Sequence, residues 1–256
     1  MFHRYRYIIP LIILFSSTLF VKGQSISLGD TAVNDAKILL RREKSGFVML
    51  HTSGIGLGYR TGKHITGYKK RMFEIELTGM KHPKEIKSIN PNFDNTKSYV
   101  YGKENFFIIL RGGIGRQKVI NSKPYWGGVE LRYFYYCGIS MGFLKPVYLY
   151  ILYETDTQYL YTYQIEQYDP QKHFSENIFG RASFFQGFSK IKPLPGIYLK
   201  TGLNFEYGAY DETIKAIECG ITVDAYTKPV PIMAFDTNKS IFLSLYLSFH
   251  FGTRRN

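Results

Sequence analysis

Residues 239–251 read KSIFLSLYLSFHF, and apolar side chains occupy every second position of this stretch. The apolar set consists of Ile241, Leu243, Leu245, Leu247, Phe249 and Phe251. The polar set consists of Ser244, Tyr246, Ser248 and His250. Because successive side chains of a β-strand point to opposite faces, the pattern predicts a strand with one apolar and one polar face.

The same period of two recurs along the chain and predicts seven further strands. They span residues 46–60, 70–80, 104–115, 126–142, 146–154, 197–208 and 214–226. Aromatic residues make up 17% of the chain, with 22 Tyr and 20 Phe, and 24 glycines accompany them. This composition excludes a disordered chain and a helical bundle rich in Ala, Leu, Glu and Lys. The 2 cysteines are too few for a disulfide-stapled scaffold.

The polar faces decide between a soluble β protein and a membrane barrel, because both would show alternation. Gly54, Gly56 and Gly58 would weaken a water-facing strand, whereas inside a narrow barrel they make room for large side chains. Tyrosines at strand ends suit the aromatic girdles at the two membrane interfaces. We therefore expect an all-β fold, an eight-stranded antiparallel transmembrane up-and-down β-barrel over residues 46–252 in contact with outer-membrane lipid. A secreted soluble β protein is the alternative.

The first residues have the pattern of an export signal. Arg4 and Arg6 precede an apolar stretch over residues 8–20, and the small residues Val21 and Gly23 follow. This predicts a signal peptide over residues 1–23, with an uncleaved membrane anchor as the alternative. We expect residues 24–45 to form a periplasmic N-terminal segment and residues 253–256 a C-terminal tail.

An even number of strands places both ends of the barrel chain on one side of the membrane. The predicted strands then put the connections 81–103, 143–145 and 209–213 in the periplasm and the remaining ones outside. The chain has a formal net charge of +13, and the connection 81–103 carries part of it. Its basic residues form either a solvated loop or a docking surface for an acidic periplasmic protein. The residues proposed for docking are Lys81, Lys84, Lys87 and Lys97. The compartment excludes nucleic acid as a partner.

Charged residues also fall on the inward-facing positions of neighbouring predicted strands. Buried charges must be paired, so they are expected to form an alternating network inside the barrel. A filled interior favours a closed barrel, and a narrow channel or transporter is the alternative. The predicted network consists of Arg60, Glu74, Glu76, Arg111, Glu130 and Arg132.

In these respects the chain resembles the small outer-membrane β-barrel proteins of Gram-negative bacteria, of the eight-stranded OmpA/OmpX type. The likeness rests on the signal peptide ending Val21-Lys22-Gly23-Gln24, the alternating Tyr/Phe-rich strands, and a final strand that closes with Phe249-His250-Phe251-Gly252. It implies an outer-membrane location and a final strand that the membrane assembly machinery recognises. It does not imply one activity. We expect a structural or interaction role, or alternatively a barrel subunit of a secretion or surface-assembly complex.

Signals for chemistry are weak. His51-Thr52-Ser53 has the His-x-Ser spacing of barrel lipid deacylases and is assigned here to the lipid face, but no acidic partner is placed. His64, His82 and His173 lack the spacing of metal ligands. We therefore predict no enzymatic activity, no catalytic residue, no cofactor and no metal site.

Overall fold

The computed structural model describes residues 42–93, 96–123, 128–154, 161–208 and 212–255, all within one compact unit, Ala36–Asn256. The predicted signal peptide, and the predicted N-terminal segment up to residue 41, lie outside the described residues. No helix in the described ranges is long and apolar enough to cross a membrane.

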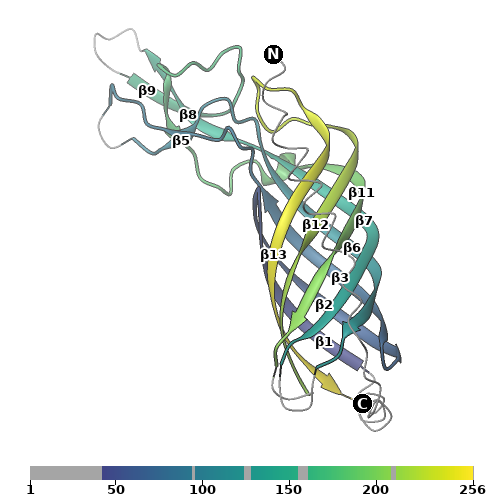
Figure 1. Cartoon of the computed structure of the whole chain (residues 1–256). Coiled ribbons are helices and arrows are strands. Elements are labelled where there is room, and N and C mark those ends of the chain that lie inside the picture. The colour runs from purple at the N-terminus through teal and green to yellow at the C-terminus, as the bar shows by residue number, and fades with distance from the viewer. Residues whose placement is uncertain (1–41, 94–95, 124–127, 155–160, 209–211, 256) are drawn as a thin grey trace, which may run out of the picture. The chain divides into compact units, whose positions relative to one another are not determined.

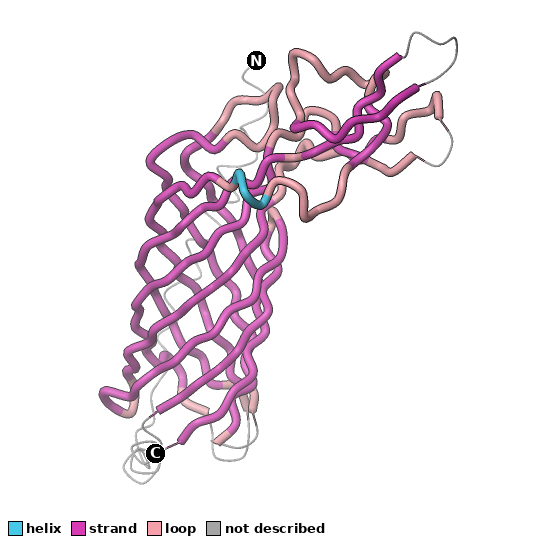
Figure 2. The backbone as a smooth tube through the Cα atoms, turned by 180° about the vertical axis from the view of Figure 1, so that it is seen from behind, coloured by secondary structure: helices cyan, strands magenta, loops and turns pink. Residues whose placement is uncertain are grey.

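Eight antiparallel strands form a closed barrel, which confirms the predicted fold class (Figures 1 and 2). Each strand pairs with the next barrel strand along the chain, and β1 pairs with the last strand, β13, to close the ring. The barrel strands are β1 (Arg42–His51), β2 (Gly54–Thr66), β3 (Lys69–Met80), β6 (Asn105–Asn121), β7 (Glu130–Pro146), β11 (Lys192–Glu206), β12 (Thr213–Val230) and β13 (Lys239–Arg255).

The barrel wall is apolar outside and polar inside. On β13, Leu243 and Leu245 have 68% and 56% of their surface exposed, whereas Ser244 and Ser248 are buried. A soluble protein would arrange these faces the other way round, because apolar side chains avoid water. The chain is therefore a transmembrane β-barrel, and an eight-stranded barrel of this kind lies in the outer membrane.

The prediction of one strand over residues 46–60 is wrong. This stretch forms a hairpin in which β1 and β2 meet at the two-residue turn Thr52-Ser53, with Leu50 opposite Ile55. The turn lacks the Asn-Gly or Asp-Gly pair that marks most two-residue hairpins, so the sequence gives little sign of it. Odd-numbered residues face the interior before the turn and lipid after it, since Met49 is buried and Ile55 is exposed.

The prediction that residues 146–154 form a barrel strand is also wrong. They form β8 (Tyr148–Glu154), which pairs with β9 (Tyr161–Gln167) and β10 (Ile178–Arg181) in a separate three-stranded sheet. One error removes a barrel strand and the other adds one, so the predicted number of strands is still eight. The predicted order of strands and connections is nevertheless wrong. The barrel strands also begin four residues earlier and end three residues later than the predicted 46–252.

The corrected topology changes the side on which the connections lie. The connections 67–68, 122–129 and 207–212 join strands at the end where β1 begins and β13 ends. The other end has the turn 52–53, the connection 231–238 and the two longest connections, 81–104 and 147–191. Outer-membrane barrels have short periplasmic turns and longer external loops. By this rule we assign the long connection 81–104 to the external end, which differs from its predicted periplasmic placement.

The three external connections 81–104, 147–191 and 231–238 pack together, and we call them the surface module. Besides β8, β9 and β10, the module contains the short pair β4 (Lys87–Ser88) and β5 (Tyr99–Val100) and the 3-10 turn η2 (Phe188–Lys190). Figure 1 shows β5, β8 and β9 beyond one end of the barrel strands. The apolar core of the surface module joins two of the connections. It consists of Tyr99, Val147, Leu149, Ile151, Tyr168 and Ile178.

Hydrogen bonds join the parts of the module. The Asn90 side-chain amide donates to the carbonyl oxygens of Ile178, at 2.9 Å, and Glu176, at 3.2 Å. The Ala234 amide of the third connection donates to the Gly102 carbonyl at 2.8 Å. Because these bonds link segments far apart in sequence, the module is one folded body.

Candidate functional site

The barrel interior is layered along its axis. Next to the external mouth lies an apolar layer that includes Met80, Phe107, Leu144 and Tyr226. Below it, ion pairs and aromatic rings fill the bore, and a second set of ion pairs lies at the periplasmic end. An interior filled by side chains is the expected state of an eight-stranded barrel.

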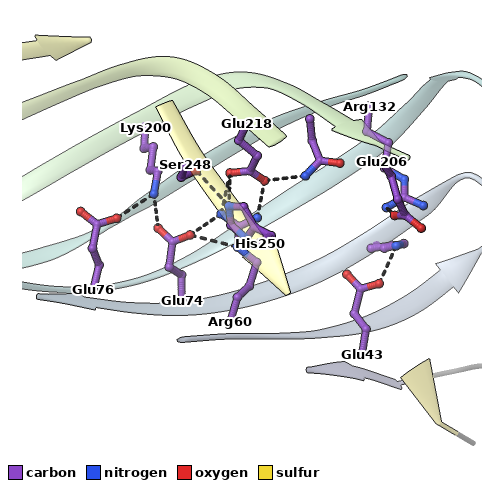
Figure 3. Close-up of polar contacts among 12 residues, drawn as sticks. Glu43, Arg60, Glu74, Glu76, Arg132, Lys200, Glu206, Glu218, Ser248 and His250 are labelled. Atoms are coloured by element: carbon purple, nitrogen blue, oxygen red, sulfur yellow. Dashed lines mark hydrogen bonds and ion pairs between the residues drawn. The ribbon is translucent and has the colours of Figure 1, made fainter. Parts of the chain in front are cut away.

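The central ion pairs cross the bore (Figure 3). Lys200 on β11 donates to Glu74 at 2.9 Å and to Glu76 at 2.7 Å, and both carboxylates lie on β3. Arg111 on β6 contacts Glu76 and donates to Asp224 of β12 at 2.8 and 2.7 Å. In the ring of eight strands, β11 and β3 are three positions apart, as are β6 and β12. These side chains therefore brace opposite walls.

Arg60 and Glu218 complete the central network. Arg60 on β2 donates to Glu74 at 2.5 Å and to Glu218 of β12 at 3.0 Å. Glu218 also accepts from the Asn204 amide at 2.9 Å and lies 3.1 Å from Nε2 of His250. Each of these carboxylates is fully buried. The desolvation cost of such charges is large, and several partners per carboxylate offset it.

Aromatic rings pack around these charges, and glycines make the space for them. The Arg60 guanidinium lies 4.8 Å from the ring centre of Tyr136, which is buried. A Cβ atom at Gly115 would lie 2.4 Å from both the Tyr136 ring and the Tyr135 carbonyl oxygen. The interior therefore requires glycine opposite this tyrosine.

The second network closes the periplasmic end. Glu43 of β1 accepts from Lys70 at 2.6 Å and from Arg254 of β13 at 3.2 Å. Arg254 also donates to Glu206 at 2.5 Å, and Arg132 contacts Glu206 and donates to Glu130. Sequence reasoning missed three of these residues. Glu43 and Arg254 lie outside the predicted barrel. Lys70 falls on the same face as Glu74 in the alternating pattern, so the pattern alone was enough to predict it as inward-facing.

The structure brings together the six residues of the predicted network, but in two groups. Arg60, Glu74, Glu76 and Arg111 join the central network. Arg60 pairs directly with Glu74 and Arg111 with Glu76, and Lys200 links the two pairs. The other two, Glu130 and Arg132, pair at 2.9 Å in the periplasmic network.

The four lysines proposed for docking all belong to the surface module. Lys84 forms an ion pair with Asp236 at 3.0 Å, and its hydrogen bond lowers the pKa of that carboxyl. Lys81 joins the barrel mouth through its backbone amide, which donates to Ser53. Lys87 lies on β4, and Lys97 lines a pocket. Docking of a periplasmic partner through these residues stays a prediction, and the corrected topology places all four at the barrel end opposite the short turns.

The pocket beside Lys97 is basic. It has a volume of about 350 Å³ and is also lined by Lys145, Arg181 and Phe184. Lys145 is only 1% exposed, and its ammonium lies 4.6 Å from the ring centre of Phe184 and 5.0 Å from that of Phe106. Among the described residues, Lys145 has no ion pair and no side-chain hydrogen bond. The aromatic rings offset only part of the cost of burying its charge.

The positions of His51 and Ser53 do not match the lipid-face prediction. His51 continues the inward-facing phase of β1, after Phe47 and Met49, and its Nδ1 accepts from the Ser53 amide at 3.3 Å. Both residues lie at the external hairpin end. No cluster of three or more potential metal ligands occurs in the part of the chain that the structure describes.

The solved structures that are similar to this chain include three outer-membrane proteins. Neisserial surface protein A is 10% identical, with a TM-score of 0.39 and coverage of 83% of this chain and 95% of that one. The N-terminal β-barrel domain of Pseudomonas aeruginosa OprF is 8% identical, with a TM-score of 0.34 and coverage of 83% and 98%. Ail, the attachment invasion locus protein of Yersinia pestis, solved with the heparin analogue sucrose octasulfate, is 8% identical, with a TM-score of 0.38 and coverage of 84% and 96%.

No family model and no curated protein matches the sequence. The closed ring of eight strands with an apolar exterior confirms the resemblance to small outer-membrane β-barrels at the level of the fold.

Proposed function

We propose that this protein is a non-conducting outer-membrane barrel that holds a recognition module at the cell surface. The observation that carries the proposal is the packing of three separate connections into one body with its own apolar core. Spanning the membrane needs only short turns, as at the periplasmic end. Ordered loops on a rigid scaffold are a common arrangement for binding sites.

The pocket of the module supports a partner that carries an anionic group. Lys97, Lys145 and Arg181 line one pocket, and Lys145 is a buried cation without an ion pair to any described residue. A sulfate, phosphate or carboxylate group would supply the counter charge, and Arg181 offers planar donors for such a group.

Binding of intact cells to an immobilised sulfated glycan tests the recognition role. Cells that produce the protein should be retained on this surface more than on the unsulfated glycan. Lys97→Gln/Arg181→Gln should reduce retention about tenfold, because two cations leave the pocket. The control Lys87→Gln/Lys172→Gln removes the same charge from module positions outside the pocket and should leave retention unchanged. Equal retention of the parent on both glycans would contradict an anion-recognising module.

The ion pairs that cross the bore support a barrel without a conducting path. Purified protein in a planar lipid bilayer should therefore show no steady single-channel current. A steady current from the parent, lost on blocking the bore, would favour the narrow channel instead. The proposal includes no catalytic step.

A further inference from the structure

The outer face of the barrel carries a row of cations at its periplasmic end. Five basic residues lie directly opposite one another on five adjacent strands, in the order β13, β1, β2, β3 and β6. They are Arg255, Arg42, Lys63, Arg71 and Arg116. All five side chains are exposed. We call these residues the cation row.

The cation row has no acidic member and no acidic neighbour in contact. Among the described residues, none of the five forms an ion pair. A second like-charged pair, Lys69 opposite Lys118, lies further toward the periplasm. Side chains directly opposite on antiparallel strands are about 5 Å apart, and like charges at that distance destabilise the sheet. An anion from outside the protein would therefore stabilise the row by reducing this repulsion.

The position of the row identifies the source of that anion. On β3, Arg71 lies two residues from Phe73 on the same outer face, and on β6 Arg116 lies two residues from Ile114. Phe73 and Ile114 are exposed on the lipid-facing wall. Residues two apart on a strand are separated by roughly 7 Å. On β2 and β6 the exposed Ile65 and Ile120 follow Lys63 and Arg116 toward the strand ends. The row therefore lies among apolar side chains near this end of the wall, a position from which basic side chains can extend to lipid headgroups.

A shallow depression of about 380 Å³ lies at the row. Arg42, Lys63 and Arg71 contribute to its lining together with Lys44, and Phe73 and Ile114 provide apolar walls. Such a surface matches a lipid with a charged phosphate and an acyl chain better than it matches a soluble acidic segment, which would leave the apolar walls uncovered.

We propose that the cation row binds acidic glycerophospholipids of the inner leaflet of the outer membrane. Each phosphate accepts hydrogen bonds from neighbouring guanidinium groups, and the bound lipids relieve the repulsion along the row. The barrel is consequently more stable in a membrane that contains acidic phospholipid than in a zwitterionic one.

Stability in vesicles of defined composition tests this proposal. The full chain is refolded into phosphatidylcholine vesicles, with and without phosphatidylglycerol, and unfolding is followed in urea by heat-modifiable gel mobility. Phosphatidylglycerol should raise the urea midpoint of the parent. Arg71→Gln/Arg116→Gln should raise the midpoint in pure phosphatidylcholine, because repulsion falls, and should reduce the gain from phosphatidylglycerol. A loss of structure alone could not produce these opposite signs.

Direct retention of lipid separates the possible anions. In native mass spectrometry from detergent, the parent should retain phosphatidylglycerol over phosphatidylcholine, and the double variant should retain it about tenfold less. The control Lys87→Gln/Lys172→Gln should behave as the parent in both assays. Equal retention of the two lipids by the parent would overturn the proposal, as would full competition by soluble glycerol phosphate or preferential crosslinking of the row to an acidic protein.

Discussion

Arg60 on β2 and Glu218 on β12 are 158 residues apart in sequence, yet the Arg60 Nη2 atom lies 3.0 Å from the Glu218 Oε2 atom. The pair joins strands three positions apart in the barrel ring, and both side chains are buried. The outer face of a membrane barrel is covered by lipid, so the interior has to hold opposite walls together with its own side chains. In this barrel, ion pairs that cross the bore do so together with packed aromatic and apolar side chains.

Loss of the Glu218 carboxylate should destabilise the barrel strongly. Glu218→Ala leaves the Arg60 guanidinium with one fewer carboxylate and the Asn204 amide without its acceptor. Breaking a buried pair by removing one partner costs about 3–5 kcal/mol. The urea midpoint measured by heat-modifiable mobility should fall accordingly. Lys172 forms an exposed pair with Asp169 at 4.0 Å, so Lys172→Ala should change the free energy of unfolding by only about 0–1 kcal/mol. Similar midpoints for both variants would contradict the bracing role.

A methyl group at Gly115 should also destabilise the barrel. A Cβ there would meet the Tyr135 carbonyl oxygen and the Tyr136 ring, each at 2.4 Å, so backbone or ring must move. Overpacking of this kind costs about 1–3 kcal/mol. Gly112→Ala is the matched control on the same strand, because nothing lies within 4 Å of its added Cβ. Equal unfolding midpoints for Gly115→Ala and Gly112→Ala would mean that the interior is looser than described.

The Asn90 side chain should hold the surface module together without affecting the barrel. Asn90→Ala removes its hydrogen bonds to Glu176 and Ile178, and should expose the connection 81–104 to limited proteolysis while the heat-modifiable mobility stays unchanged. Asn92→Ala is the control, since its backbone amide rather than its side chain bonds to Asn90. Cleavage at the parental rate in Asn90→Ala would show that the module does not depend on this side chain.

The contact between Lys84 and Asp236 should respond to acid. The hydrogen bond from Lys84 lowers the pKa of Asp236 below its ordinary value, so the folded state binds the proton less readily than the unfolded state. The contribution is present above about pH 4 and is lost as the pH falls below it. Spin labels at Ile86→Cys and Asn238→Cys, in a chain without Cys137 and Cys219, should show a broader distance distribution at pH 3 than at pH 6. With Asp236→Asn the distribution should be equally broad at both pH values.

The sequence predicted the barrel because alternation reports directly on which face of a strand meets lipid. It predicted Arg60, Glu74, Glu76 and Arg111 as inward-facing for the same reason. Alternation does not mark where one strand turns into the next, and Thr52-Ser53 carries no strong turn signal. It also does not distinguish a barrel strand from β8, which alternates inside a small sheet of its own.

These errors had a large consequence for function. Because one hairpin was predicted as a single strand, each later connection was assigned to the wrong side of the membrane. The extra strand predicted at 146–154 returned the connections after it to the correct side. The connection 81–104 fell between the two errors, and its lysines were placed in the periplasm. The long-range packing that forms the surface module, such as Asn90 against Ile178, leaves no local signature in the sequence.

The central claim is that the module lies outside the cell on a barrel whose short turns face the periplasm. Labelling of intact cells with a membrane-impermeant maleimide tests it most directly, with single cysteines at Lys87→Cys and Lys69→Cys in a background without Cys137 and Cys219. Lys87→Cys should label on intact cells, whereas Lys69→Cys, beside the turn at 67–68, should label only after the outer membrane is permeabilised. Labelling of Lys69→Cys but not Lys87→Cys on intact cells would contradict the topology and the proposed function with it.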